Sequence, residues 1–300
     1  MTPSELTSRR LENQSISTSK PKTPLEVVRN LVALQAQDYL GALWSIALRT
    51  PHCTQEEVLA AITKRQIVRT WPMRGTLHFV AGEDIRWMLS LLAPRIIKGL
   101  AGRQRQLELT PDNFERSRSI LTKELRGGRQ LGRREAYVLL EKEGISCQGQ
   151  RGIHILQLLC LEGLLCFGAH INKEPSFTLL EEWVPSTPSR DRSASLAELT
   201  LRYFTSHGPA TLQDLMWWSG LTATDAKAGL EAVKSFLISE KIEEKEYWFA
   251  PNDTPENHSL YLLPGFDEYL LGYKDRSAAL DIHHAPKVVP GNNGDRKSVV

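Results

Sequence analysis

The feature that most constrains the fold is one order of elements that recurs three times along the chain. Apolar residues spaced three and four apart predict short helices, and β-rich segments interrupted by proline or glycine predict hairpins. Three helices followed by a hairpin is the order of a winged helix-turn-helix module. We therefore predict a mainly α fold with small β-hairpin wings, made of three tandem winged helix-turn-helix modules.

The first copy begins with a helix over residues 24–34, for which Thr23 is the expected N-cap. Two more helices are expected over 42–48 and from residue 54 onwards, where apolar residues again recur with a helical period. The β-rich segment 67–80 is expected to form the wing, because it is interrupted by proline and glycine. These elements complete one module.

The second and third copies repeat this order. The second is predicted to have helices over 133–140 and 149–160 and a wing formed by 164–167 and 177–179. In the third, a helix over 196–204 precedes a helix that ends at Gly220, and residues 222–233 follow as the candidate recognition helix. This helix-glycine-helix spacing is that of a helix-turn-helix.

The module boundaries follow from composition. We expect a flexible tail over residues 1–20, because this segment is polar and carries few apolar groups. The modules are expected over 21–109, 110–190 and 191–294, and a Pro- and Ser-rich linker at 185–190 precedes the third. Residues 295–300 are expected to be a non-native tail that truncates the third module, because a common sequencing-adapter sequence encodes the same residues.

The composition is that of an ordinary globular protein. Of 300 residues, 41% are hydrophobic and 24% are charged, and the net charge of +2 permits a nucleic-acid partner without requiring one. The four cysteines form no Cys-x-x-Cys pair, and no apolar run is long enough to span a membrane. His283 and His284 lack partners at metal-ligand spacing. We expect a cytoplasmic, nucleoid-associated protein without a metal, cofactor or membrane partner.

Three clusters of basic residues favour a DNA partner. Blocks of this kind can contact phosphates, although a single block is more commonly a solvated helix face. The clusters are Arg65/Arg69/Arg74, Arg95/Lys98/Arg103/Arg105 and Arg126/Arg129/Arg133/Arg134. From these patterns alone, a non-catalytic winged-helix DNA-binding regulator and a protein-interaction scaffold both remain open.

Three motifs carry a family resemblance. Residues 34–38 read LQAQD, residues 69–78 read RTWPMRGTLH, and residues 263–276 read LPGFDEYLLGYKDR. They resemble the winged-helix DNA glycosylases that unhook interstrand crosslinks, the azinomycin-resistance type, and the resemblance extends from about residue 20 to Gly294. It implies that the three modules form a concave DNA-binding channel.

The resemblance also implies a catalytic Gln-aliphatic-Gln motif, which falls here on Gln35 and Gln37. Ala36 is the smallest aliphatic residue that this motif admits, and the chain lacks the Asp that a sister branch carries in the second place. The same motifs supply the side chains that we expect to bind DNA, namely Arg69, Arg74, Thr76, His78, Lys274 and Arg276.

Two glutamines suit only one kind of glycosidic chemistry. An N7-alkylated purine is already cationic and leaves without a strong general acid, so the enzyme must place a water and stabilise an oxocarbenium-like sugar. An amide offers a carbonyl acceptor and two N–H donors, and two amides can hold one water. We therefore predict a monofunctional glycosylase that acts on alkylated purines in double-stranded DNA, with interstrand crosslinks as a further candidate substrate. We expect it to be a monomer.

The spacing of the two glutamines makes a structural demand. Residues two apart in a straight α-helix point about 200° from each other. If Gln35 lies on the apolar side of the helix, Gln37 faces away, so the helix is expected to end or distort near Ala36. The alternative is that Gln35 is a buried amide capping its own helix and Gln37 is a surface residue.

Other candidate residues have weaker support. Asp38 is the nearest carboxylate and could steady the sugar cation, but as a helix-terminal residue it could instead be a cap. Asp267 and Glu268 are expected to lie in a strand and to point to opposite faces, so that they do not act as one pair. The tryptophans at 71, 217 and 218 could stack on bases, but we expect them in the core.

Overall fold

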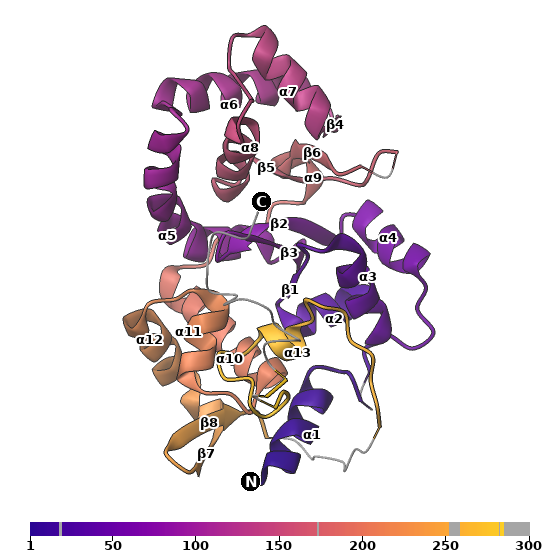
Figure 1. Cartoon of the computed structure of the whole chain (residues 1–300), viewed down its shortest axis with the longest axis vertical. Coiled ribbons are helices and arrows are strands. Elements are labelled where there is room, and N and C mark those ends of the chain that lie inside the picture. Colours follow the sequence, from indigo (N-terminus) through magenta and orange to yellow (C-terminus); the bar gives the residue numbers. More distant parts are fainter. Residues whose placement is uncertain (18–19, 173, 252–258, 282, 285–300) are drawn as a thin grey trace.

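The computed structural model describes residues 1–17, 20–172, 174–251, 259–281 and 283–284. They form a mainly helical protein with small antiparallel sheets (Figure 1). The helices are α1 (Pro3–Asn13), α2 (Pro24–Leu31), α3 (Tyr39–Leu48), α4 (Gln55–Thr63), α5 (Ile85–Gln106), α6 (Pro111–Leu125), α7 (Arg133–Lys142), α8 (Arg151–Leu161), α9 (Leu180–Trp183), α10 (Arg192–His207), α11 (Leu212–Ser219), α12 (Ala223–Val233) and α13 (Glu268–Leu271). The strands are β1 (Ala33–Gln35), β2 (Ile67–Met73), β3 (Thr76–Ala81), β4 (Leu131–Gly132), β5 (Leu165–Phe167), β6 (Ser176–Leu179), β7 (Ile238–Ile242) and β8 (Lys245–Phe249).

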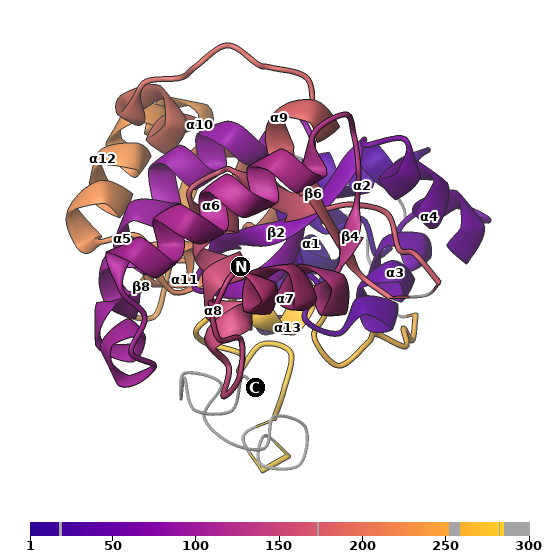
Figure 2. The same cartoon turned by 90° about the horizontal axis from the view of Figure 1, so that it is seen from above.

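The hairpins predicted for the first two copies belong to one sheet. Its strand order is β1-β3-β2-β5-β6-β4, and β2 meets β5 where Arg69 pairs with Phe167. The turn between β2 and β3 is made by Arg74 and Gly75, both at positive φ. In Figure 2, α6 and α7 lie in front of this sheet, and β2 is visible between them. The sheet therefore joins elements that the sequence assigned to separate units.

The third copy has a hairpin of its own, which sequence analysis missed. Strands β7 and β8 follow α12 and pair from Ile238–Phe249 to Ile242–Lys245. Four of their ten residues are charged and only two are buried, so the segment lacks the apolar alternation that would have indicated strands. The expected end of α11 is observed, with Gly220 as a left-handed C-cap.

The first residues form a helix, and the prediction of a flexible tail over 1–20 is wrong for this part of the chain. Helix α1 has a capping box between Thr2 and Glu5. Arg10 is buried, donates from Nε to the Pro209 carbonyl at 2.9 Å, and lies 3.7 Å from the ring centroid of Tyr273. Polar side chains here make specific intramolecular bonds, which a count of apolar residues does not reveal.

Helix α2 is shorter than predicted. It ends at Leu31, and Val32 has φ 67°, so the chain leaves the helix three residues before Leu34. Residues 33–35 instead pair with β3, from Ala33–Val80 to Gln35–His78. Local helical periodicity continued to Leu34, but pairing with a strand more than forty residues away decided the conformation.

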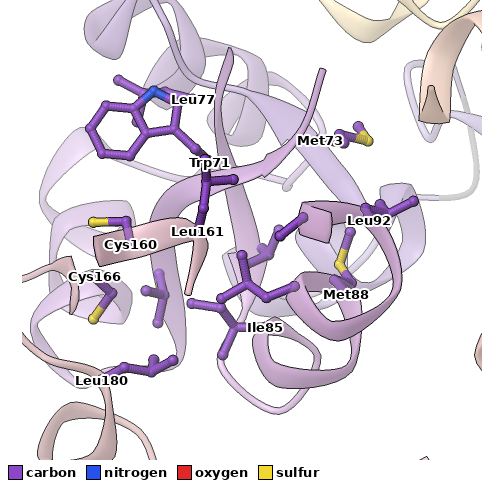
Figure 3. Close-up of a cluster of buried hydrophobic side chains, with 14 of the residues drawn as sticks. Trp71, Met73, Leu77, Ile85, Met88, Leu92, Cys160, Leu161, Cys166 and Leu180 are labelled. Carbon is purple, nitrogen blue, oxygen red and sulfur yellow. The ribbon is translucent and has the colours of Figure 1, made fainter. Parts of the chain in front are cut away.

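The hydrophobic interior consists of two clusters of buried side chains. The larger runs from β2 and α5 through α8 into α10 and α11, and Figure 3 shows the part around Trp71, Met88 and Cys160. The smaller lies among α2, α3, α4 and β1. Trp71 and Trp218 are buried in the larger cluster, which confirms their expected place in the core, whereas Trp217 is only partly buried.

Several absences hold for the described residues. None of their helices is both long and apolar enough to cross a membrane. No group of three or more His, Cys, Asp or Glu side chains within this part of the chain could hold a metal ion. The cysteines are all unpaired thiols. The predicted non-native tail at 295–300 lies outside the described residues.

Candidate functional site

The two glutamines lie on a strand and the bend that follows it, rather than on a helix. Gln35 is the last residue of β1, and Gln37 lies just before α3, which begins at Tyr39. Side chains two apart on extended backbone point to the same face. The helix was expected to end near Ala36, and it ends five residues before it, at Leu31.

The backbone of this motif is held from three directions. The Gln35 N–H donates to Glu268 Oε1 at 2.8 Å, and the Ala36 N–H donates to the Leu77 carbonyl at 2.8 Å. The Ala36 carbonyl accepts from Arg69, at 3.1 Å from Nε and 2.7 Å from a terminal guanidinium nitrogen. These bonds leave the segment between the glutamines little freedom to shift.

The side chains of the two glutamines differ in exposure. Gln35 is 9% exposed, and among the described residues its Oε1 is buried without a hydrogen-bond partner. Gln37 is exposed, and its Oε1 accepts from the Leu77 N–H at 3.3 Å. A buried acceptor without a partner is costly, and a bound water or ligand is one way in which it can be satisfied.

Asp38 is the N-cap of α3. Its Oδ1 accepts from the Gly41 N–H at 3.2 Å. A Cβ at Gly41 would lie 2.6 Å from Asp38 Oδ2, so glycine leaves room for this cap. The capping alternative is therefore observed. Asp38 is also exposed beside Gln37, so electrostatic support by its carboxylate stays a prediction.

Arg69 is a structural residue of the motif, which corrects its predicted contact with DNA. It is 8% exposed, and its guanidinium lies over the rings of Tyr39 and Phe167, at 5.2 and 5.1 Å from their centroids. Burial lowers its pKa to about 10. A guanidinium enclosed by rings and bonded to Ala36 cannot reach a phosphate without leaving these contacts.

His78 is likewise buried, and its predicted contact with DNA is corrected for the same reason. The side chain has no exposed surface, and Nδ1 lies 3.0 Å from the Thr76 carbonyl. Nε2 lies 3.4 Å from a guanidinium nitrogen of Arg74. Burial and the neighbouring Arg74 charge lower the pKa of His78 to about 4, so the ring is neutral at pH 7.

The remaining candidates for DNA contact have mixed exposure. Arg74, in the β2–β3 turn, and Thr76, the first residue of β3, are partly exposed, although Thr76 Oγ1 itself is buried. Lys274 is exposed, while the partly exposed Arg276 donates from Nε to the Leu270 carbonyl at 2.9 Å. Among these four, Lys274 has the most accessible charge.

Glu268 contacts the glutamine motif and the preceding Asp267 pairs with Arg49, and neither contact was predicted from the sequence. The two acids are not in a strand: Asp267 is the N-cap of α13 and Glu268 its first residue, because Asp267 Oδ1 accepts the Tyr269 N–H at 2.9 Å. Asp267 forms a fully buried ion pair with Arg49, with both N–O distances at 2.7 Å. The expectation that the two acids act separately fits their different partners.

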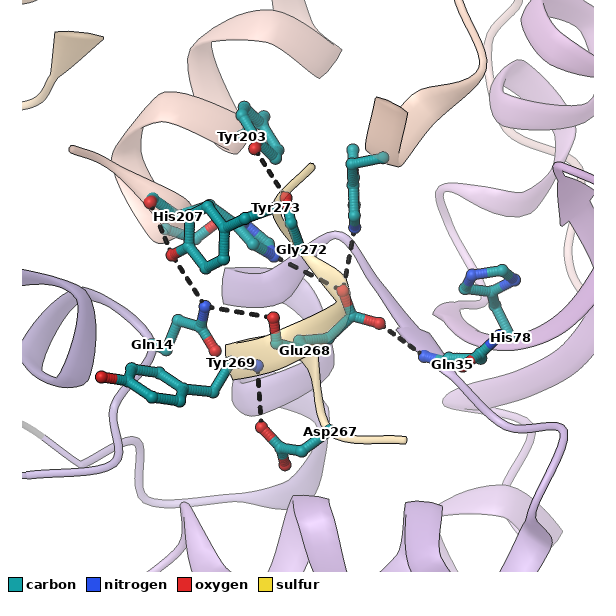
Figure 4. A network of polar contacts seen from close by, with 12 residues as sticks. Gln14, Gln35, His78, Tyr203, His207, Asp267, Glu268, Tyr269, Gly272 and Tyr273 are labelled. Carbon is teal, nitrogen blue, oxygen red and sulfur yellow. Dashed lines mark hydrogen bonds and ion pairs between the residues drawn. The ribbon is translucent and has the colours of Figure 1, made fainter. Parts of the chain in front are cut away.

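Glu268 connects β1 to the third copy of the repeat (Figure 4). One carboxylate oxygen accepts from the Gln35 N–H, and the other accepts from Trp218 Nε1 at 2.9 Å and lies 3.6 Å from His207 Nε2. Burial by itself raises the pKa of Glu268, but His207, His78 and Arg74 outweigh it and lower the pKa to about 2. Both carboxylate oxygens also accept N–H hydrogen bonds, which favours the charged form, so the side chain is an anion at neutral pH.

One sequence signal could have indicated this network. Two adjacent acids stand inside an otherwise apolar and aromatic segment, from Phe266 to Tyr273. Acids in such a setting are buried only when they are paired or hydrogen-bonded. The identity of the partners could not be read from the sequence, because Arg49 and Gln35 lie more than 200 residues away.

Comparisons with known proteins agree with this fold. The model of a family described as DNA glycosylase AlkZ-like matches residues 28–300. An interstrand DNA cross-link repair glycosylase of Streptomyces sahachiroi is 26% identical over 291 residues, covering 88% of this chain and 75% of the relative. The solved structure of Streptomyces sahachiroi DNA glycosylase AlkZ superposes with a TM-score of 0.81 at 22% identity, over 96% of this chain and 82% of that chain.

Proposed function

Because this chain belongs to the AlkZ-like DNA glycosylase family, we propose that it is a monofunctional glycosylase that hydrolyses the N-glycosidic bond of N7-alkylated purines in double-stranded DNA. The relative named as an interstrand cross-link repair glycosylase supports extending the substrates to crosslinks joined through such purines. No cofactor is needed, because the leaving base carries its own positive charge.

The observation that carries this proposal is the buried, unpartnered Oε1 of Gln35 close in sequence to the exposed amide of Gln37. These two amides hold a water beneath the anomeric carbon, with Gln35 Oε1 accepting one of its hydrogens. The rigid backbone of the motif keeps both amides in place. Holding a reactant in position in this way lowers the barrier without proton transfer in the first step.

The reaction balances without a general acid. The water oxygen forms a bond to the anomeric carbon while the bond from that carbon to the purine nitrogen breaks. The electron pair of the broken bond neutralises the cationic purine, which leaves as a neutral base, and the proton of the water passes to solvent. Ordinary purines are neutral and leave poorly, so this site spares undamaged DNA.

We further propose that the three copies of the repeat are winged helix-turn-helix modules that line a concave channel for DNA. Exposed cations on α5 and at the start of α7 are the candidates for phosphate contacts: Arg95, Lys98, Arg103, Arg105, Arg133 and Arg134. They replace the buried Arg69 and His78 in this role. The protein acts as a monomer on DNA of the nucleoid, in the cytoplasm.

A base-release assay tests the proposed function. The measurement is the single-turnover release of 7-methylguanine from methylated duplex DNA by the wild type, Gln35→Ala, Gln37→Ala and the double variant. Gln55→Ala, an exposed glutamine in the first turn of α4, is the matched control. We expect the control to match the wild type and the double variant to lose most of its rate.

Two results would reject parts of this proposal. Undiminished release by a folded double variant would reject the role of the glutamines. No release by the folded wild type would reject this substrate, and salt-sensitive DNA binding without any abasic product would instead favour a non-catalytic DNA-binding protein.

A further inference from the structure

We propose that Glu268 is a positioning residue for Gln35, acting through the hydrogen bond between its carboxylate and the Gln35 backbone N–H. This inference rests on the proposed function of the two glutamines. It adds a residue that lies 233 positions further along the chain and touches neither the water nor the DNA in that mechanism.

The first support is the place of β1 in its sheet. β1 is an edge strand with β3 as its neighbour. Backbone N–H groups on a strand alternate between its two sides, and the Ala36 N–H donates to the carbonyl of Leu77 in β3. The Gln35 N–H therefore points outward, where a further strand would supply a carbonyl. Glu268 Oε1 occupies that place at 2.8 Å.

The second support is that both carboxylate oxygens are needed. Oε1 accepts from Gln35 and Oε2 accepts from Trp218 Nε1, while the side chain is fully buried. A carboxylate is an acceptor at both ends, whereas a glutamine amide is an acceptor at one end and a donor at the other. An amide at position 268 must therefore set a donor against either the Gln35 or the Trp218 N–H.

The third support is that the backbone of α13 is anchored independently of this carboxylate. Asp267 is bound to Arg49, and the Tyr203 hydroxyl donates to the Gly272 carbonyl at 2.8 Å. The Gln14 amide donates to the Glu268 carbonyl at 3.4 Å. These contacts hold the helix in place without the carboxylate, which instead accepts the hydrogen bond from the strand that carries Gln35 (Figure 4).

The position of Gln35 matters because its amide works by geometry alone. Displacement of a reacting group by about 1 Å can cost on the order of 100-fold in rate. If the outward N–H of Gln35 meets a donor in place of an acceptor, the end of β1 shifts and the buried Oε1 moves with it. Affinity for DNA, which depends on other side chains, is unchanged.

The test combines Glu268→Gln with Trp218→Phe. In Glu268→Gln alone, the amide N–H of the new glutamine always faces the N–H of either Gln35 or Trp218. We expect single-turnover release of 7-methylguanine to fall roughly 10- to 100-fold at unchanged DNA affinity. Trp218→Phe removes the indole N–H, so in the double variant the amide can turn its oxygen to Gln35. We expect the double variant to release base at least about fivefold faster than Glu268→Gln.

Asp214→Asn is the matched control. Asp214 is a buried carboxylate that binds the backbone N–H groups of Lys274 and Asp275, in the same C-terminal segment, without touching the glutamines. We expect it to lower the melting temperature and to leave the release rate within about twofold of the wild type.

The outcomes separate this inference from the proposed function. If the wild type releases no base, the proposed function fails. Hydrogen exchange still tests the contact in that case: the Gln35 backbone amide should lose protection in Glu268→Gln and regain it in the double variant. If the wild type is active, three results would each overturn the positioning role. They are a wild-type release rate in Glu268→Gln, an equal loss of release rate in Asp214→Asn, and a double variant that releases base no faster than Glu268→Gln.

Discussion

Arg69 donates two hydrogen bonds to the carbonyl of Ala36, the residue between the two glutamines. Its guanidinium is enclosed by Tyr39 and Phe167, so a residue of the β2–β5 junction supports the proposed catalytic segment directly. A cation that looked like part of a DNA-binding cluster is thus part of the support for the site.

Arg69→Lys is expected to impair the site without weakening contacts to phosphate. Lysine cannot donate in a planar fork or stack between two rings in the same way, so we expect the unfolding free energy to fall by about 1–3 kcal/mol and base release to slow. The slope of log affinity against log salt should equal that of the wild type. In contrast, Arg103→Ala removes an exposed cation and should reduce that slope by about 0.9. A reduced slope in Arg69→Lys would contradict its buried role.

Asp267→Asn should be strongly destabilising. It leaves the guanidinium of Arg49 buried with one charged partner removed, and breaking such a pair typically costs about 3–5 kcal/mol. Urea denaturation measures the change. Arg116→Ala, which removes the exposed ion pair with Asp112, serves as the comparison and should change stability by less than about 1 kcal/mol. Similar losses in the two variants would refute the importance of burial for this pair.

Arg10→Ala tests whether α1 is an integral part of the fold. The variant loses the bond from Nε to the Pro209 carbonyl and the contact with the Tyr273 ring. We expect the unfolding free energy to fall by about 2–3 kcal/mol. Ser4→Ala, at an exposed position of the same helix, should have little effect. Equal stability of Arg10→Ala and the wild type would restore the view of this segment as a flexible tail.

His78 is expected to make stability depend on pH. Its folded pKa of about 4 lies below an unfolded value of about 6.5, so between these values the unfolded chain binds more protons. The contribution of the neutral ring is therefore present above pH 6.5 and is lost as the pH falls towards 4, by up to about 3 kcal/mol. His207, whose pKa burial also lowers, acts in the same direction.

Denaturation of the wild type and His78→Phe between pH 7 and 4.5 measures this contribution. The curve for His78→Phe should be flatter, and exposed His284→Gln should follow the wild type. Parallel curves for the wild type and His78→Phe would show that His78 does not titrate with a lowered pKa.

Sequence analysis and structure agree best where a signal is local. The hairpin at 67–80, the Gly220 cap and the helices over 133–140 and 222–233 could be predicted, because helical period, turn residues and caps act over a few neighbouring positions. The motif that carries the family was also visible in the sequence.

The helical character, the recurring order of elements and the pair of glutamines at 35 and 37 can all be read from the sequence. Three features cannot: Gln35 ends a strand, Arg69 and His78 face inward, and Glu268 reaches Gln35 from near the other end of the chain. They are out of reach because strand pairing and the burial of charges depend on partners far away in sequence. The local sequence pattern shows which residues are polar, but it does not show which of them contact one another in the folded protein.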